Sequence, residues 1–510
     1  MAPIFCYRCG DAVEEGCDPR DELAELDDLM ERLRLKRYDL KRKINRFHSP
    51  IVRQLPPDIT STIFEFCLPD VTDYPLSPFE KNFSIPFSPL SLGAICSYWR
   101  NIAWSTPSLW SSLAVHNPDK HNSHTVTGTA REWLTRSGQL PLSIFILSTF
   151  HNKTVLALID IINQYSTRWS NLDLCIPDSY YQHFHAPDNN HSVIHTPILK
   201  SIRLHRLDDL NETILNFQLT SCHHLERASL SYIPMDGSNI HWDNLTHLTL
   251  IFMSFTDVFH ILLNTPRLVF CRVSDDIDPN QIIGPPVVSA IKSLQLHLFF
   301  TEEFLDNLIA PHLEELKLTR YYFPETEVHI TSFFRRSACS LRSLSIIFTI
   351  LISRYFEDFM NLLQSMPSLT TLSLSMSTPG PEEHHPRNIF HLLAKVLSSQ
   401  STPLQRGFLP NLKILEYTGE LYLHPGNYDD IYPLPPVDNA VYGPLHLFQL
   451  DLHPVTRISG SMISYISSLA ERGVTVNVVS RSEDIIQSSI DYYRCRLQDW
   501  SDNLDLGLLS

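Results

Sequence analysis

The sequence predicts an α/β solenoid that follows a single helix and a small all-helical domain. Three observations predict it. Apolar residues stand at heptad spacing in residues 19–48, two short aromatic-rich helical patterns occupy residues 51–113, and the motif Leu-x-x-Leu-x-Leu then recurs along the rest of the chain. A strand with its neighbouring helix forms a unit that cannot bury its apolar face alone. Repetition of such units therefore predicts that they stack into a solenoid.

The composition indicates a folded chain and disfavours several kinds of partner. Of the 510 residues, 43% are hydrophobic and 19% are charged, which is enough apolar material for a substantial core. The formal net charge of -16 opposes binding to phosphates, so we expect no nucleic-acid partner. No apolar run reaches the roughly 18 residues of a membrane span, and the start carries no signal-peptide core. We therefore expect no membrane partner and an intracellular location, cytoplasmic or nuclear or both.

Residues 1–18 are predicted to be a flexible N-terminus, and residues 19–48 a heptad helix. Asp18-Pro19 is typical of a helix start. The a and d positions of the heptads form one apolar stripe, interrupted only by Arg37: Leu23, Leu26, Met30, Leu33, Leu40, Ile44 and Phe47. Two interpretations stay open. The stripe would form a coiled coil that makes the chain a dimer through residues 23–47, or it would pack on the next domain.

The helical domain at residues 51–113 is predicted to contain two helices. The first opens at Pro56-Pro57, after Leu55, and its apolar residues stand at helical offsets: Ile59, Ile63, Phe64 and Cys67. The second ends at Thr106-Pro107, after which Trp110 docks back. Its predicted apolar face consists of Leu92, Ile95, Cys96, Trp99 and Ala103. An aromatic-rich helix pair of this kind is more often plain core than a recognition surface.

These residues nevertheless resemble the F-box, in the form common among mushroom-type fungi. The motifs that carry the resemblance stand in order: Leu55-Pro56-Pro57-Asp58-Ile59, then Cys96, Trp99-Arg100 and Ile102-Ala103, then Thr106-Pro107-x-Leu109-Trp110. The heptad helix before them belongs to the same resemblance. Two features depart from the family pattern, because Asp58 stands where glutamate is commoner and residues 71–87 form a long insertion. Neither departure removes an apolar anchor.

The resemblance implies an F-box protein, the substrate-recognition subunit of a cullin-type SCF ubiquitin ligase. Such a subunit binds a Skp-family adaptor, and through it the cullin scaffold, while the rest of the chain holds a protein target. The implied adaptor-binding residues are Leu55, Pro56, Pro57, Ile59, Ile63, Trp99 and Trp110. Docking is consistent with the physics, because an exposed apolar patch on a small helical domain is costly unless a partner covers it.

After a predicted linker at residues 114–130, residues 131–480 are predicted to form an irregular leucine-rich-repeat-like horseshoe with parallel strands and outer helices. Clear copies of the motif begin at Leu199, Leu245, Ile291, Leu313, Leu341, Leu369, Leu412 and Leu445, and weaker copies at Trp169, Leu225 and Leu268. Each copy places alternate apolar side chains on one face of a strand. Helices are expected at residues 255–263 and 356–363.

The turns and the end of the array are predicted to be irregular. Regular leucine-rich repeats carry Asn or Cys shortly after the third apolar position, whereas Phe299, Tyr321 and Ser377 stand there in this chain. We therefore predict irregular turns and an uneven curvature. Val474 to Val479 is predicted to be a closing strand, and residues 481–510 a C-terminal cap and tail.

We expect no catalytic residue, no metal and no cofactor. Cys6-x-x-Cys9 is half of a zinc motif whose other half is missing. Four histidines in one loop lack carboxylates in a defined register: His183, His185, His191 and His195. The sequence contains no Gly-rich phosphate loop and no Gly-x-Ser-x-Gly elbow.

The sequence therefore favours a non-enzymatic substrate receptor of an SCF ligase. An F-box scaffold that acts outside a ligase is the alternative, and a cryptic enzyme is a weaker one. The sequence leaves open the identity of the target, its need for phosphorylation, dimerisation, and the choice between nucleus and cytoplasm.

Overall fold

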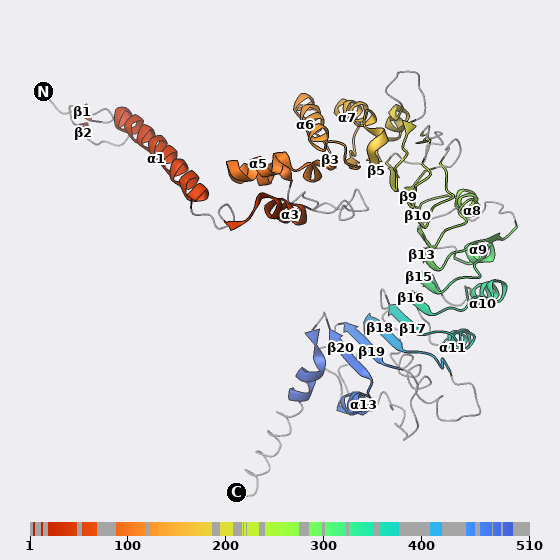
Figure 1. The fold of residues 1–510 in the computed structure, drawn as a ribbon. Coiled ribbons are helices and arrows are strands. Elements are labelled where there is room, and N and C mark those ends of the chain that lie inside the picture. Colours follow the sequence, from red (N-terminus) through yellow and green to blue (C-terminus); the bar gives the residue numbers. More distant parts are fainter. Residues whose placement is uncertain are drawn as a thin grey trace, which may run out of the picture. The chain divides into compact units, whose positions relative to one another are not determined.

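The computed structural model of the chain falls into two compact units, residues 1–145 and 146–510 (Figure 1). The predicted insertion at residues 71–87 lies outside the described residues. The structure describes residues 4–5, 12–13, 19–47, 54–68, 88–118, 122–185, 194–207, 217, 219–220, 222–233, 240–274, 285–297, 301–322, 326–350, 356–376, 408–420, 445–453, 460–471, 473–480 and 483–492.

The first unit opens with a short antiparallel pair, β1 (Ile4–Phe5) and β2 (Ala12–Val13), and continues with the long helix α1 (Pro19–Phe47). The helix begins at the predicted residue, because proline at the first helical position has a pre-set φ and lacks an N–H that would have no partner there. The leucines of the predicted stripe are exposed, so no part of the described chain covers them.

A small helical core follows α1. Its elements are α3 (Pro57–Cys67), α4 (Pro89–Ile95), α5 (Ser97–Ser105) and the 3-10 helix η2 (Pro107–Trp110). The buried side chains that meet in this core are Phe64, Leu92, Ile102, Ala103, Leu109 and Trp110. Trp110 is held from several sides. Its Nε1–H donates to the Ala103 carbonyl at 2.7 Å, and its ring stands edge-on to Trp104 and Trp133, with centroids 5.2 and 4.9 Å away.

The second helix of the predicted pair is in fact two helices, so this prediction is wrong in one respect. The helix breaks at Cys96, whose backbone is extended at φ -158° and ψ 167°. The Cys96 sulfur accepts a hydrogen bond from the Trp99 backbone N–H at 3.4 Å and so caps α5. The apolar offsets continue on both sides of Cys96, which is why the pattern does not reveal the break. As a consequence Ile95 ends α4 and is exposed.

The described residues of the predicted linker at 114–130 also belong largely to regular elements. The range contains most of strand β3 (Ser112–His116) and the first half of helix α6 (Ser123–Arg136). The indole N–H of Trp133 on α6 donates to the Ser112 carbonyl at 3.0 Å and fixes the helix to the strand. The polar run between the two elements is typical of a linker, because the buried residues of α6, Ala130 and Leu134, come only at the end of this range and after it. The boundary between the units falls inside β4 (Leu142–Leu147), which follows β3 in strand order.

Gly93 allows α4 to approach α5. An added Cβ would stand 2.1 Å from Cζ3 of the Trp104 ring, whereas a Cβ added at Gly128 on α6 meets nothing within 4 Å. We expect Gly93→Ala to destabilise the first unit by about 1–3 kcal/mol, because the ring must move out of a packed position. Gly128→Ala is the matched control and is expected to stabilise α6 by about 0.5–1 kcal/mol. Chemical unfolding of the two variants measures both effects, and equal effects would contradict this account of the packing.

The predicted α/β solenoid is confirmed in its main features. The second and third apolar positions of every predicted copy fall on one strand, and the predicted closing strand at 474–479 corresponds to the last strand given below. The strands are β5 (Trp169–Ile176), β7 (Ser201–Arg206), β9 (Arg227–Ser231), β10 (His247–Ile251), β11 (Phe270–Ser274), β13 (Ser293–His297), β15 (Glu315–Tyr322), β16 (Ser343–Ile350), β17 (Thr371–Met376), β18 (Ile414–Glu420), β19 (Leu447–His453) and β20 (Thr475–Ser480).

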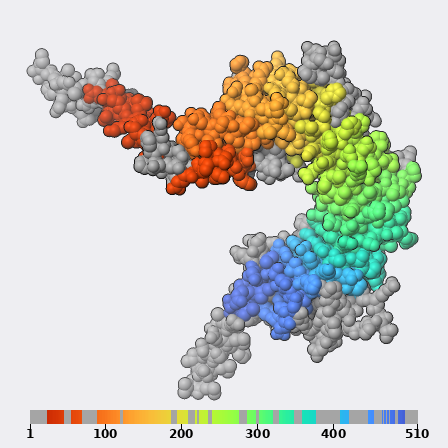
Figure 2. Space-filling model, viewed as in Figure 1, coloured from red at the N-terminus to blue at the C-terminus, as the bar shows by residue number. Residues whose placement is uncertain are grey.

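These strands pair in parallel, in the order just given, with the motif positions in register. Leu248 on β10 stands opposite Cys271 on β11, which in turn stands opposite Leu294 on β13. The second and third apolar positions of each motif copy are buried, because these alternate residues of a strand point to the same face. Repeats from β9 to β17, coloured green to cyan, form one continuous body in the space-filling view (Figure 2).

Helices cover one side of this sheet. The described helices of the second unit include α7 (Lys153–Asn163), α8 (Phe255–Leu263), α9 (Thr301–Asp306), α10 (Thr326–Ser337), α11 (Phe356–Gln364) and α13 (Gly460–Glu471). The predictions at residues 255–263 and 356–363 are thereby confirmed. Helices α8 to α11 lie on the same side of the strands (Figure 1). They bury apolar residues such as Phe259 and Leu363, and leave the other face of the sheet free of described helices.

The turns and the end of the array are irregular. Tyr232 and Phe252, just after β9 and β10, adopt φ of 57° and 52°, which bulky residues rarely do. Phe299 and Ser377 lie outside the described residues, and Tyr321 lies within β15. After β20 a short antiparallel strand β21 (Glu483–Asp484) closes the sheet, and residues 485–492 are helical. The rest of the predicted tail lies outside the described residues.

Candidate functional site

Three apolar side chains are exposed on one face of α3. Ile59, Ile63 and Phe66 stand at offsets i, i+4 and i+7, and their exposed fractions are 46%, 43% and 86%. Residues at these offsets lie above one another along a helix, so the three side chains form a continuous strip, here called the α3 patch.

Helix α3 is apolar on two faces, and only one of them packs in the core. Thr60 and Phe64 are buried, and the Phe64 ring lies 4.9 Å from that of Trp99 on α5. In the described part of the chain nothing covers the α3 patch. Large apolar side chains gathered on the surface of a small domain are typical of a protein-binding site.

Hydrogen bonds hold α3 in place beneath the patch. The Thr60 hydroxyl donates to the Pro56 carbonyl at 3.1 Å, and the Ser108 hydroxyl of η2 donates to the Glu65 carboxylate. The first bond lies within the start of α3, and the second joins the last turn of the helix to η2, so the patch stands on a helix anchored at its C-terminal end.

The structure places the predicted adaptor-binding residues in two groups. Pro56 and Pro57 are exposed at the start of α3, next to Ile59, and Leu55 is half-buried before them. Pro56 precedes Ile63 by seven residues, so these two lie on the same side of α3. Trp99 is half-buried and Trp110 is buried, so both support the patch from within the core.

Sequence reasoning did not predict the exposure of several apolar residues on α3 and α4. Phe66 extends the α3 patch, and Leu90 and Ile95 are exposed on α4. The signal for Phe66 was present, since α3 carries more apolar residues than one buried face can use. Nothing in the sequence distinguished Phe66 from Phe64, because the choice of buried face depends on where α5 packs.

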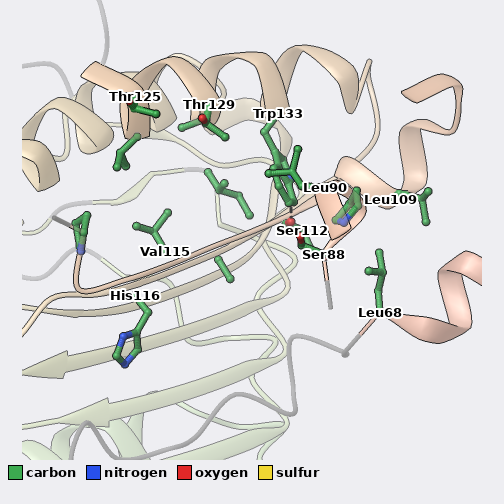
Figure 3. Close-up of a pocket in the computed structure, with 16 residues that line it drawn as sticks. Leu68, Ser88, Leu90, Leu109, Ser112, Val115, His116, Thr125, Thr129 and Trp133 are labelled. Carbon is green, nitrogen blue, oxygen red and sulfur yellow. Dashed lines mark hydrogen bonds between the residues drawn. The ribbon is translucent and has the colours of Figure 1, made fainter. Parts of the chain in front are cut away.

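A cavity of about 440 Å³ lies in the first unit between α6, β3 and the ends of α3 and η2 (Figure 3). Its walls include Leu68, Leu90, Leu109, Val115 and Trp133. The Trp133 indole N–H is already bonded to the Ser112 carbonyl. Among the described residues that line the cavity, His116 is the one ionisable side chain, so the cavity offers a ligand mainly apolar contact.

The second unit presents a row of side chains on the strand face that its described helices leave open. On each strand, one residue lies between the two inner apolar positions. These residues stand opposite one another on neighbouring strands and together form the row. Its members are Asp173, Arg203, Ser229, Thr249, Arg272, Gln295, Lys317, Ser345, Ser373, Glu416, Gln449 and Asn477. All are polar, which is typical of a solvated face that can hydrogen-bond to a partner.

The row begins with a buried ion pair. Arg203 Nη1 lies 2.7 Å from the Asp173 carboxylate, whose side chain is buried. Burial raises the pKa of the Asp173 carboxyl to about 7, although the positive charge of Arg203 lowers it. Burial also lowers the pKa of neighbouring His205 to about 4 and raises that of the Cys175 thiol to about 12. Asp173 is therefore the group of this cluster whose charge changes near neutral pH.

The free energy of unfolding of wild type, relative to Asp173→Asn, is expected to fall as the pH rises from about 5 to about 8. The native carboxyl keeps its proton up to about pH 7, whereas the unfolded chain releases it near pH 4. The contribution of the protonated Asp173 carboxyl to the free energy of unfolding is therefore fully present below pH 4. It is lost as the pH rises through 7. Urea unfolding of both proteins across this range measures the difference, and a difference that does not change with pH would contradict the raised pKa.

Neither a metal cluster nor a membrane-spanning helix is present among the described residues. No group of three or more His, Cys, Asp or Glu side chains is gathered there in a way that could hold a metal ion. Cys6, Cys9 and His191 lie outside the described residues. No helix within the described part of the chain is long and apolar enough to cross a membrane.

Comparison with protein-family models gave no match, and comparison with curated proteins found no similar sequence. The resemblance to the F-box therefore rests on the motifs between Leu55 and Trp110.

Proposed function

We propose that the chain is the substrate-recognition subunit of a cullin-type SCF ubiquitin ligase. The helical core of the first unit would be its F-box and would dock on a Skp-family adaptor. The solenoid would be a leucine-rich-repeat-like receptor that holds a protein target. In this role the chain brings the target close to the ubiquitin-transfer machinery and performs no chemistry itself.

The α3 patch is the observation that carries the proposal. It consists of residues that the F-box resemblance assigns to the adaptor, Ile59 and Ile63, extended by Phe66. Burying three such side chains is worth roughly 1.5–3 kcal/mol each when the partner covers them completely. Exposed apolar area of this size needs an explanation, and an adaptor groove provides one.

The polar row of the second unit supports the receptor part of the proposal. Twelve parallel strands align one polar side chain each, so an extended segment of a target can contact several repeats at once. Solenoids use extended faces of this kind for binding. The row is in register throughout, which gives a target a regular array of hydrogen-bonding groups.

Co-purification of the full-length chain with a Skp-type adaptor and a cullin tests the function. The proposal predicts a complex of all three, in which the cullin is retained only when the adaptor is present. Capture of the adaptor without the cullin would favour the F-box scaffold outside a ligase. Failure of the folded chain to capture the adaptor would overturn both.

A further inference from the structure

The charges of α1 are divided between its two halves. Residues 21–31 hold six acidic and no basic side chains, and residues 32–46 hold eight basic and one acidic side chain. The described ion pairs of this helix are local, as between Arg32 and Asp28 at 2.8 Å and between Lys43 and Asp39 at 2.9 Å. Asp27 and Arg37 have no ion-pair partner within the described residues.

The helix dipole does not account for this division. Favourable interactions of charges with the dipole are confined to the first and last turns of a helix. Here the change of sign falls between Glu31 and Arg32, in the middle of a helix of 29 residues. Charges this far from both ends of α1 are consistent with a partner helix whose basic half lies beside the acidic half of α1, and whose acidic half lies beside the basic half.

The apolar stripe of α1 lies along the same helix and is uncovered. Leu33, at a d position, is 56% exposed. Leu35 is 61% exposed but stands on the opposite face of the helix, two residues further on. The stripe from Leu23 to Ile44 extends over three heptads, close to the shortest length at which two helices pair.

We propose that α1 pairs with α1 of a second copy of the chain in an antiparallel coiled coil. Antiparallel pairing places the acidic half of each helix against the basic half of the other. In the register that sets Met30 against Leu33 of the second copy, Asp27 of each copy faces Arg34 of the other. The dimer therefore contains two such pairs, one on either side of its centre. Arg37, which interrupts the stripe, then meets the acidic half of the other helix beside Leu26.

A parallel pair would bring like charges together. Residues at g positions of one helix then face e positions of the next heptad on the other. This arrangement sets Lys36 against Lys41, and Glu22 against Asp27. The charge pattern thus selects one direction of pairing and one occupant for the stripe, a second copy of this chain. The pairing does not depend on the function proposed for the other parts of the chain.

Charge reversal in the full-length chain tests the direction of pairing. Asp27→Arg and Arg34→Asp are each expected to raise the dissociation constant of the dimer about 10-fold, because each variant turns two attractive pairs into repulsive ones. A mixture of the two variants is expected to restore wild-type affinity, since opposite charges face each other again in the mixed antiparallel dimer. Sedimentation equilibrium measures these constants. A mixture that associates no better than either variant would overturn the antiparallel arrangement.

The two leucines of α1 test the stripe. Leu33→Lys is expected to raise the dissociation constant at least about 100-fold, because it places a charge in two layers of the dimer. Leu35→Lys adds the same charge to the outer face and is expected to change the constant less than about 3-fold. Equal effects of the two variants, or a wild-type chain that is monomeric at its highest soluble concentration, would overturn the proposal.

Discussion

Adaptor affinity is expected to fall at least about 100-fold in the double variant Pro57→Ala, Ile59→Asp. Ile59 is exposed in the α3 patch, and a carboxylate there would be buried without a partner once the adaptor docks, at a cost of several kcal/mol. A 100-fold loss corresponds to about 2.7 kcal/mol. Isothermal titration of the purified full-length chain with a Skp-type adaptor measures it.

The double variant is expected to fold like wild type. Residue 59 is in the first turn of α3, where a negative charge interacts favourably with the helix dipole. Leu140→Asp is a matched control, because Leu140 follows α6 in the same unit and is 38% exposed, close to the 46% of Ile59. We expect that control to bind the adaptor within about 2-fold of wild type. If both variants bound equally well, the α3 patch would not be the docking surface.

Trp110→Ala is expected to destabilise the first unit by about 3–5 kcal/mol, the usual cost of truncating a buried tryptophan. The substitution removes the ring that packs edge-on against Trp104 and Trp133, and it removes the donor to the Ala103 carbonyl. The Arg136 guanidinium, 4.9 Å from the Trp110 ring centroid, also loses a cation–π contact. Urea unfolding of the full-length chain measures the loss.

Trp110→Phe serves as the control for that prediction. It keeps an aromatic ring in the core but removes the Nε1–H donor, and we expect it to cost about 1–3 kcal/mol. Residue 107, which follows the last turn of α5, is proline and cannot supply an N–H to the Ala103 carbonyl in its place. A Trp110→Ala variant as stable as wild type would contradict the placement of this side chain in the core.

The repeats could be predicted because their pattern determines their structure locally. Leu248 and Leu250 alternate with polar residues, so one face of a strand must be buried, and the same spacing in each copy keeps the strands in register. The start of α1 at Pro19 was equally local, since proline in the first turn and acidic residues after it are sufficient signals.

Other features depend on contacts between distant residues and could not be predicted. Cys96 has apolar neighbours at helical offsets on both sides, and only the packing of α4 against α5 shows that the helix breaks there. Trp110 belongs to the adaptor-binding motif by resemblance, yet its hydrogen bond to Ala103 places it in the core. Phe66 is exposed because Phe64 occupies the position that packs against Trp99.

Hydrogen–deuterium exchange of the full-length chain, with and without a Skp-type adaptor, tests the docking of the first unit most directly. The account predicts slower exchange in residues 54–68 of the adaptor-bound chain, around the α3 patch, and unchanged exchange in strands β9 to β17 of the second unit. Slower exchange confined to the strands of the second unit, or no change in a folded chain at saturating adaptor, would contradict it.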